Sequence, residues 1–194
     1  MLQVILDVET KKTFDEVGGF FPDRLGISFV GVCVRENFGE AGEMMSFFEK
    51  DLKDLFPILE RADVVVGYNV DNFDMPTFIP YYSGDITTIP TLDLMIKIQD
   101  SFGHRIALDS VAKETLGTGK SGDGLDAIKY YRNGELDKLK AYCLQDVKVT
   151  RDVYDYGLKA GAVKFRNKWN RLIECPVDFA FAPQKNAGVQ MSLI

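Results

Sequence analysis

Acidic residues occur in three segments of this sequence where each could hold a divalent cation. The first segment is Asp7-Val8-Glu9, directly after the apolar run Val4-Ile5-Leu6. Side chains alternate along a β-strand, so Asp7 and Glu9 are expected to face the same side of a strand that ends here. Two carboxylates at such a short distance repel each other unless a cation lies between them. The alternative is a polar strand end that faces solvent, and Asp-x-Glu alone does not decide between the two.

The second acidic segment, residues 67–74, follows the apolar run Val64-Val65-Val66. Asp74 is expected in the first turn of a helix, where the helix dipole stabilises a carboxylate. Asp71 or Asn72 could cap that helix. The alternative is that all these residues are capping residues, although three Asp or Asn among four positions exceed what one cap requires.

The third segment, residues 142–146, lies in a long helical pattern. Tyr142 and Asp146 are four residues apart and therefore share one face of the helix. Leu139 and Val149 fall on the same face, which places Asp146 close to the core. A buried carboxylate without a partner is costly, and a bound cation would remove that cost. The alternative is a Tyr–Asp pair on the surface of the helix.

The elements that must position these residues alternate between strands and helices. Apolar runs predict strands over 2–7, 25–34, 44–48 and 63–68, with a helix over 51–61. Helical spacing then predicts helices over 72–82, 92–102, 109–116, 123–132 and 135–156, followed by short strands over 161–165 and 172–179. Strands followed by a largely helical half indicate an α/β fold built around a mixed sheet.

Composition limits the class of protein. The chain has 194 residues, 46% of them hydrophobic, which suits one large folded domain. Its net charge is −6 and its pI about 4.9, which argues against the basic footprint of a nucleic-acid coat protein. No apolar run approaches the roughly 20 residues of a membrane helix. The N-terminus is too short and too acidic for a secretory signal, so we expect a soluble, cytoplasmic protein without a membrane partner.

The three cysteines, Cys33, Cys143 and Cys175, are far apart and form no CxxC pair. This spacing predicts neither a zinc site nor a disulfide framework. Cys143 lies in the helical pattern of residues 135–156 and is expected to be a small core residue.

In this order, the three acidic segments resemble the DEDD superfamily of ribonuclease-H-like 3′–5′ exonucleases. The matches are Asp-x-Glu at 7–9, Asn-x-x-x-Phe-Asp at 69–74 and Tyr-x-x-x-Asp at 142–146. The last form is similar to the tyrosine subclass, which includes proofreading domains of DNA polymerases. A histidine-subclass member would have His where this chain has Ala141, and the single histidine, His104, is expected in a surface loop.

The resemblance covers roughly residues 2–156 and implies a ribonuclease-H-like mixed β-sheet flanked by helices. We therefore expect an exonuclease domain over residues 1–160. Residues 161–194 would form a C-terminal extension, with a flexible tail at its end.

The resemblance also implies a two-metal site. Two divalent cations, Mg²⁺ or Mn²⁺, would be bridged by Asp7, with Glu9 and Asp146 completing the ligands of the first ion and Asp74 holding the second ion, directly or through water. These hard cations prefer oxygen ligands. Tyr142 would orient the attacking water at the phosphodiester.

On the substrate side, the resemblance implies release of 5′-mononucleotides from the 3′ end of DNA, as a single strand or a frayed end. Thr10 could meet the terminal nucleotide through its backbone, and Asn69 could hydrogen-bond the strand or its own turn. Phe73 could stack on the terminal bases, with core packing as the equal alternative.

The last five residues, Gln190-Met191-Ser192-Leu193-Ile194, resemble short peptides that bind bacterial sliding clamps. Gln190 would make a directional hydrogen bond, and Leu193 and Ile194 would enter an apolar pocket. The alternative is a disordered tail.

Two other functions remain open beside a DNA exonuclease. One is a 3′–5′ exoribonuclease that uses the same site, because contacts to the 2′-hydroxyl cannot be read from the sequence. The other is a non-catalytic adaptor for nucleic acid or a sliding clamp, which the carboxylates disfavour because a binding module has no need of them.

Overall fold

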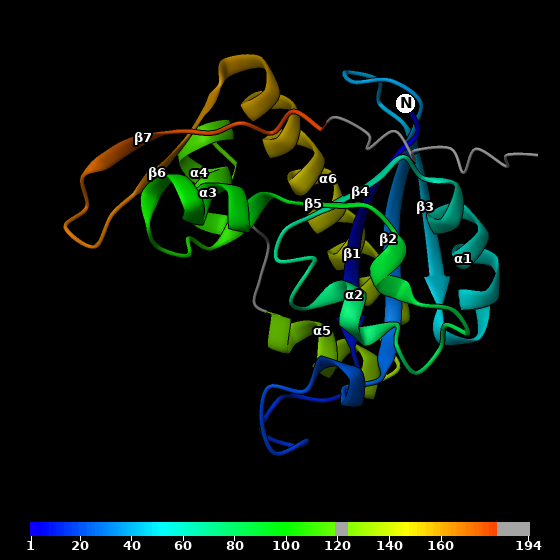
Figure 1. The fold of residues 1–194 in the computed structure, drawn as a ribbon. Helices are drawn as coiled ribbons and strands as arrows, with labels where there is room; N and C mark the ends of the chain where they lie inside the picture. Colours follow the sequence, from blue (N-terminus) through cyan, green and yellow to red (C-terminus); the bar gives the residue numbers. More distant parts are fainter. Residues whose placement is uncertain (119–123, 182–194) are drawn as a thin grey trace, which may run out of the picture.

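Five strands form a mixed sheet at the centre of the protein (Figure 1). The computed structural model describes residues 1–118 and 124–181. The strands of the sheet are β1 (Gln3–Thr10), β2 (Ile27–Arg35), β3 (Glu43–Phe48), β4 (Val64–Gly67) and β5 (Thr91–Asp93). Their order is β3-β2-β1-β4-β5, with β1 antiparallel to β2 and parallel to β4. The strand that carries Asp7 and Glu9 is therefore the central one.

Helices cover both faces of this sheet. They are α1 (Leu52–Arg61), α2 (Asp74–Thr77), α3 (Leu94–Phe102), α4 (Leu108–Leu116), α5 (Gly124–Arg132) and α6 (Leu136–Ala160), with single 3-10 turns at Pro22–Arg24, Glu49–Asp51 and Ile86–Thr88. Leu6 packs in one core cluster with Leu55 of α1, whereas Ile5 packs in another with Val149 of α6. This alternation along β1 produces two apolar layers. The predicted α/β fold with a helix-flanked mixed sheet is confirmed.

A separate hairpin follows α6. Strands β6 (Ala162–Arg166) and β7 (Leu172–Pro176) pair with each other and lie beside α3 and α4 (Figure 1). Phe165 and Phe179 are fully buried in the cluster that also contains Val149. Both strands were predicted, although the second ends at Pro176 instead of residue 179. The proposed boundary at residue 160 stays a prediction.

Two predicted helices differ most from the structure, and the helix predicted over 135–156 extends to Ala160. The predicted helix over 72–82 shrinks to the four residues of α2, because Pro80 disfavours a helical conformation in the residue before it. The predicted helix over 92–102 begins at Leu94, since Thr91–Asp93 pair with β4 as strand β5. Asp93 then caps α3 by accepting from the amides of Met95 and Ile96 at 2.9 and 3.2 Å.

Some predictions fall outside the described part of the chain. Gln190, Leu193 and Ile194 belong to residues 182–194, which are not described. Among the described helices, none combines the length and apolarity that crossing a bilayer requires.

Candidate active site

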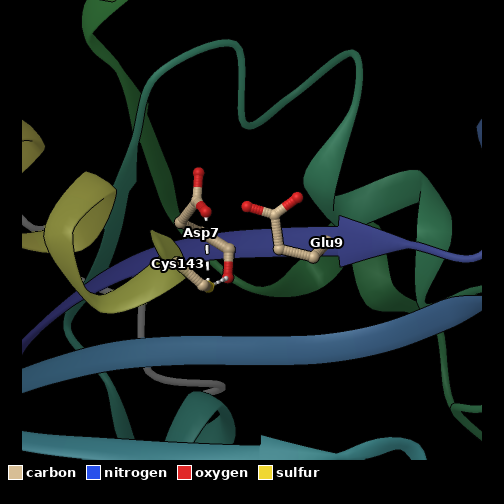
Figure 2. A group of neighbouring side chains, drawn as sticks. All are labelled: Asp7, Glu9 and Cys143. Atoms are coloured by element: carbon tan, nitrogen blue, oxygen red, sulfur yellow. Dashed lines mark hydrogen bonds between the residues drawn. The ribbon is translucent and has the colours of Figure 1, made fainter. Parts of the chain in front are cut away.

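The end of β1 brings Asp7 and Glu9 to the face of the sheet that α6 covers. Figure 2 shows both carboxylates on the same side of the strand, with Cys143 of α6 next to Asp7. Glu9 is buried, Asp7 is half-buried, and ligand atoms of Asp7, Glu9 and Cys143 all lie within 4.8 Å of one another. The predicted alternation along the strand therefore does produce a pair of adjacent carboxylates.

Helix α6 places Tyr142 and Asp146 against the same strand end. Both side chains are buried, and Tyr142 packs with Leu139 and with Phe29 of β2. Close approach of the helix depends on Gly31, which pairs with Asp7 in the sheet. A Cβ atom at Gly31 would lie only 3.0 Å from the Cys143 sulfur, so a larger residue would push α6 away from the strand.

A cavity of about 290 Å³ opens at this junction. Its lining includes six of the residues predicted for the site: Asp7, Glu9, Thr10, Phe73, Tyr142 and Asp146. It also includes Lys12, Thr13 and Phe14, which the sequence patterns did not single out. The cavity therefore presents carboxylate oxygens that could coordinate a metal ion. It also presents a phenol that could hydrogen-bond a molecule bound in the same place.

Asp74 lies beside this cavity without being among its described lining residues. It is almost completely buried, and its Oδ1 accepts a hydrogen bond from the Val8 amide at 2.9 Å. β4 ends at Gly67 and is therefore too short to offer a backbone carbonyl to the Val8 amide. The Asp74 carboxylate accepts the hydrogen bond from this amide instead. The contact joins the second acidic segment to β1.

Asp74 lies in the first turn of α2, as predicted, but its burial opposes the effect of the helix dipole. Burial raises the pKa of Asp74 well above its usual value, and the charge of Asp7 raises it further. A helix of four residues has little dipole to oppose these effects. The capping prediction is wrong, because the cap position is held by Phe73, whose side chain accepts no hydrogen bond.

Asn69 supports its own turn. Its backbone φ is +71°, a left-handed conformation that asparagine tolerates, and its amide donates to Asp93 Oδ1 at 2.9 Å. Asp93 Oδ2 also accepts from the Asp71 amide at 3.2 Å. Asp93 thus holds the turn that leads to Asp74, a role that the sequence patterns missed. Among the residues described as lining the cavity, Asn69 does not occur.

Comparison with known proteins identifies the family of this chain. Residues 4–157 match the model of the RNase_H superfamily. The chain belongs to the RNase H superfamily. No curated protein matches its sequence.

Two solved structures resemble this RNase H superfamily chain. The family B DNA polymerase from the hyperthermophilic archaeon Pyrobaculum calidifontis has 19% identity and a TM-score of 0.61, over 81% of this chain and 24% of the polymerase. E. coli Exonuclease I in complex with a 5cy-dT13 oligonucleotide has 13% identity and a TM-score of 0.48, over 81% of this chain and 40% of that one. This chain therefore spans about a quarter of the polymerase, whose likeness shows a shared fold.

The donor set of this RNase H superfamily site suits a hard divalent cation. Asp7, Glu9 and Asp146 offer carboxylate oxygens around one cavity, which is what Mg²⁺ and Mn²⁺ prefer. Burial, and after it the charge of Asp7, raises the pKa of Asp74. A bound cation would offset both effects, so the residues fit the divalent metal that the resemblance implies.

Cys143 has a contact that the sequence did not predict. It is a buried core residue, as expected, but its sulfur also lies 3.4 Å from Asp7 Oδ2 and 3.5 Å from the Asp7 carbonyl oxygen. Burial, followed by the charge of Asp7, raises the pKa of this thiol well above its usual value. The thiol is therefore protonated and donates to Asp7, fixing the orientation of one carboxylate oxygen.

Replacing Cys143 by Ala is expected to weaken Mn²⁺ binding. Hydrogen-bonded neighbours of metal ligands typically contribute 10-fold to 100-fold to affinity, and a thiol is a weak donor, so we expect roughly a 3-fold to 10-fold increase in Kd. Cys143→Ser retains a donor and should lose less. Isothermal titration calorimetry measures both, with Cys175→Ala as the control for a buried cysteine in β7. Equal Kd values for wild type and Cys143→Ala would show that the contact does not position Asp7.

Proposed function

We propose that this chain is a metal-dependent 3′–5′ exonuclease of the DEDD superfamily. It would release 5′-mononucleotides from the 3′ end of DNA. The observation that carries this proposal is the single cavity lined by Asp7, Glu9, Tyr142 and Asp146. Membership in the RNase H superfamily supports a nuclease at the level of the superfamily.

Four carboxylates would hold two ions in this mechanism. Asp7 would help to hold both ions, because it lies next to Glu9 and interacts electrostatically with Asp74. Glu9 and Asp146 would hold the first ion, and Asp74 would hold the second. Two bound Mg²⁺ or Mn²⁺ ions would supply an activated water and stabilise charge on the attacking and leaving oxygens. The protein itself keeps the carboxylates oriented through the Val8 amide and the Cys143 thiol.

Tyr142 is the residue we assign to the attacking water, which would place the protein in the tyrosine subclass. Its buried ring lines the cavity, and its phenol can donate or accept a hydrogen bond there. The preceding residue, Ala141, offers no such group, and His104 is exposed beyond α3. A histidine at the site is thus absent from the described residues.

Substrate contacts follow from the cavity lining. Thr10 is buried and its hydroxyl donates to the Lys12 carbonyl at 3.1 Å, so its backbone is the part we assign to the terminal nucleotide. Phe73 is half-buried in the cavity wall and can stack on a base. Asn69 would act through the turn that it forms with Asp93.

A parallel digestion of DNA and RNA tests the proposal. Oligonucleotides of one sequence, labelled at the 5′ end, are incubated with Mg²⁺ and with EDTA. We expect a ladder that shortens from the 3′ end of single-stranded DNA, 5′-mononucleotides by mass spectrometry, and no products in EDTA. DNA is placed first because the polymerase that shares the fold is a DNA polymerase.

The same assay separates the alternatives. Faster shortening of the RNA would favour the exoribonuclease. No hydrolysis of either strand with Mg²⁺ or Mn²⁺ would contradict the exonuclease and favour the non-catalytic adaptor. Binding to a sliding clamp through Gln190, Leu193 and Ile194 stays a separate prediction, which deletion of residues 190–194 tests.

Replacing Tyr142 by Phe is expected to slow single-turnover digestion. The variant keeps the ring that packs on Phe29 and loses only the hydroxyl. General acid–base groups typically contribute 10²-fold to 10⁴-fold, and a group that only orients water contributes less, so we expect a decrease of roughly 10-fold to 100-fold. Tyr156→Phe, on the same helix but away from the cavity, is the control. Equal rates for the two variants would remove Tyr142 from the mechanism.

A further inference from the structure

The connection between β1 and β2, residues 11–26, begins directly after the carboxylate pair. Figure 1 shows it as a long blue loop at the end of the sheet opposite the N-terminus. Lys12, Thr13 and Phe14 of this loop line the cavity. The loop therefore belongs to the wall of the candidate active site and also extends away from it.

Three phenylalanine rings form a row along this loop. Phe73 in the cavity wall meets Phe14 edge to face, with 6.0 Å between ring centroids. Phe14 in turn stacks on Phe20 at 4.6 Å, with 27° between the ring planes. Phe20 is 58% exposed, so the row leads from the buried wall of the cavity to a ring open to solvent.

The loop is held in this shape by hydrogen bonds from α5 and by hydrogen bonds within the loop. Arg132 of α5 donates to both carboxylate oxygens of Glu16, at 2.8 and 2.7 Å, and to the Lys11 carbonyl at 2.9 Å. Gly19 has a φ of +148° and donates to the Phe14 carbonyl at 3.0 Å, which folds the chain back so that Phe20 reaches Phe14. Exposure of Phe20 is thus built into the loop.

We infer that Phe14 and Phe20 form a stacking platform for unpaired bases next to the 3′ terminal nucleotide. This inference rests on the proposed exonuclease function. Its occupant is a single strand, since only unpaired bases present a free face to a ring, and every base has one. The platform is continuous with the cavity through Phe73.

Charge also favours stacking as the source of affinity. The protein carries a net charge of −6, and its cavity concentrates carboxylates, so the phosphates of a strand gain little general attraction. Stacking on aromatic rings does not depend on net charge. The platform therefore provides the grip that an acidic protein needs, and selects single-stranded or frayed ends.

Binding of a fluorescent oligonucleotide tests the platform. The probe is 5′-fluorescein-labelled single-stranded dT12, measured by anisotropy in EDTA so that no hydrolysis occurs. Phe20→Ala and Phe20→Leu are expected to raise Kd by about 5-fold to 100-fold, whereas Phe20→Tyr stays close to wild type. Phe38→Ala is the matched control, because Phe38 is 49% exposed and lies beyond the opposite end of β2.

A second probe needs no protein variant. In it, abasic sites replace the bases upstream of the 3′ terminal nucleotide. Wild type should bind this probe at least as weakly as Phe20→Ala binds dT12, and on the abasic probe wild type and Phe20→Ala should have equal affinity. Wild-type affinity in Phe20→Leu, or an equal loss in Phe38→Ala, would overturn the platform.

The two proposals fail in different ways. If wild type shortens dT12 with Mg²⁺ but Phe20→Leu binds as tightly as wild type, the platform is wrong and the exonuclease stands. If wild type shortens no strand but Phe20→Leu binds more weakly, the exonuclease is wrong and the platform stands as a single-strand binding surface.

Discussion

Replacing Asp7 by Asn is expected to lower Mg²⁺-dependent nucleotide release by at least about 100-fold, since metal ions supply several kcal/mol of transition-state stabilisation. The variant has the same shape as wild type but lacks the charge that would bridge two cations. Asp7 is half-buried beside Glu9 and its charge also acts on Asp74, so its loss affects both groups of carboxylates. Single-turnover digestion of 3′-hydroxyl DNA measures the loss.

The same substitution should stabilise the protein when metals are removed. Burial raises the pKa of Asp74, and the charge of Asp7 raises it further, so a charged Asp7 disfavours a charged Asp74 in the folded state. Removing the charge of Asp7 relieves this repulsion, so we expect a small rise in Tm in EDTA. With Mn²⁺ the order should reverse, because wild type binds the ion more tightly and gains more stability from it.

Asp100→Asn is the control for this experiment, since Asp100 is exposed on α3 and distant from the site in the fold. Neither its activity nor its Tm in EDTA should change. Full Mg²⁺-dependent activity in Asp7→Asn would contradict the metal site. A lower Tm in EDTA would show that the Asp7 charge stabilises the fold through a partner other than a cation.

The sequence predicted those parts of the site that follow from local periodicity. Asp7 and Glu9 are two residues apart on a strand, and Tyr142 and Asp146 are four apart on a helix, so each pair must share a face. The depth of Asp146 also followed from its apolar neighbours on that face, and the structure buries it. Each of these conclusions needs only the geometry of one element.

Contacts between distant elements were not predictable in the same way. The Val8 amide and Asp74 are 66 residues apart, and Cys143 and Asp7 are 136 apart. Their partners depend on how β4 ends and on how closely α6 approaches at Gly31, which are properties of the packed structure. The raised pKa of Asp74 could not be predicted for this reason, because it comes from burial and from the charge of a residue distant in sequence.

Strand β5 shows a second limit of prediction from the sequence. Thr91–Asp93 are too few to display the two-residue alternation of a strand. The apolar residues after them have helical spacing, so the sequence predicts a helix that begins too early, at residue 92. The three residues are a strand only because β4 offers them a partner. Asp93 then acquires its role from that position, where it caps α3 and holds Asn69.

Replacing Arg35 by Met is expected to lower the free energy of unfolding by roughly 2–4 kcal/mol, because a buried ion pair loses one partner. The Arg35 side chain is fully buried at the end of β2 and binds Asp155 of α6 through two nitrogens, at 2.6 and 2.9 Å. Its Nε also donates to Gln3 of β1 at 2.8 Å. One side chain thus ties the two central strands to the helix that carries Tyr142 and Asp146.

The expected loss is below the full cost of breaking a buried pair. The Asp155 side chain is 26% exposed and can be hydrated by solvent, whereas buried Gln3 loses the hydrogen bond that Arg35 donates to it. In thermal unfolding we expect a fall in Tm of roughly 5–15 °C for a protein of this size. Digestion at low temperature should change little, but activity should be lost at a lower temperature than in wild type, since α6 loses an anchor to the sheet.

Arg166→Met separates this effect from the loss of any arginine. Arg166 pairs with Glu114 at 3.0 Å but is 46% exposed, so its replacement should cost less than about 1 kcal/mol. Asp155→Leu in the Arg35→Met background should recover part of the loss, because no charge then remains without its partner. Equal changes in Tm for Arg35→Met and Arg166→Met would show that the buried pair contributes no more than a surface pair. The position of α6 against the sheet would then depend mainly on apolar packing and on the close approach that Gly31 permits.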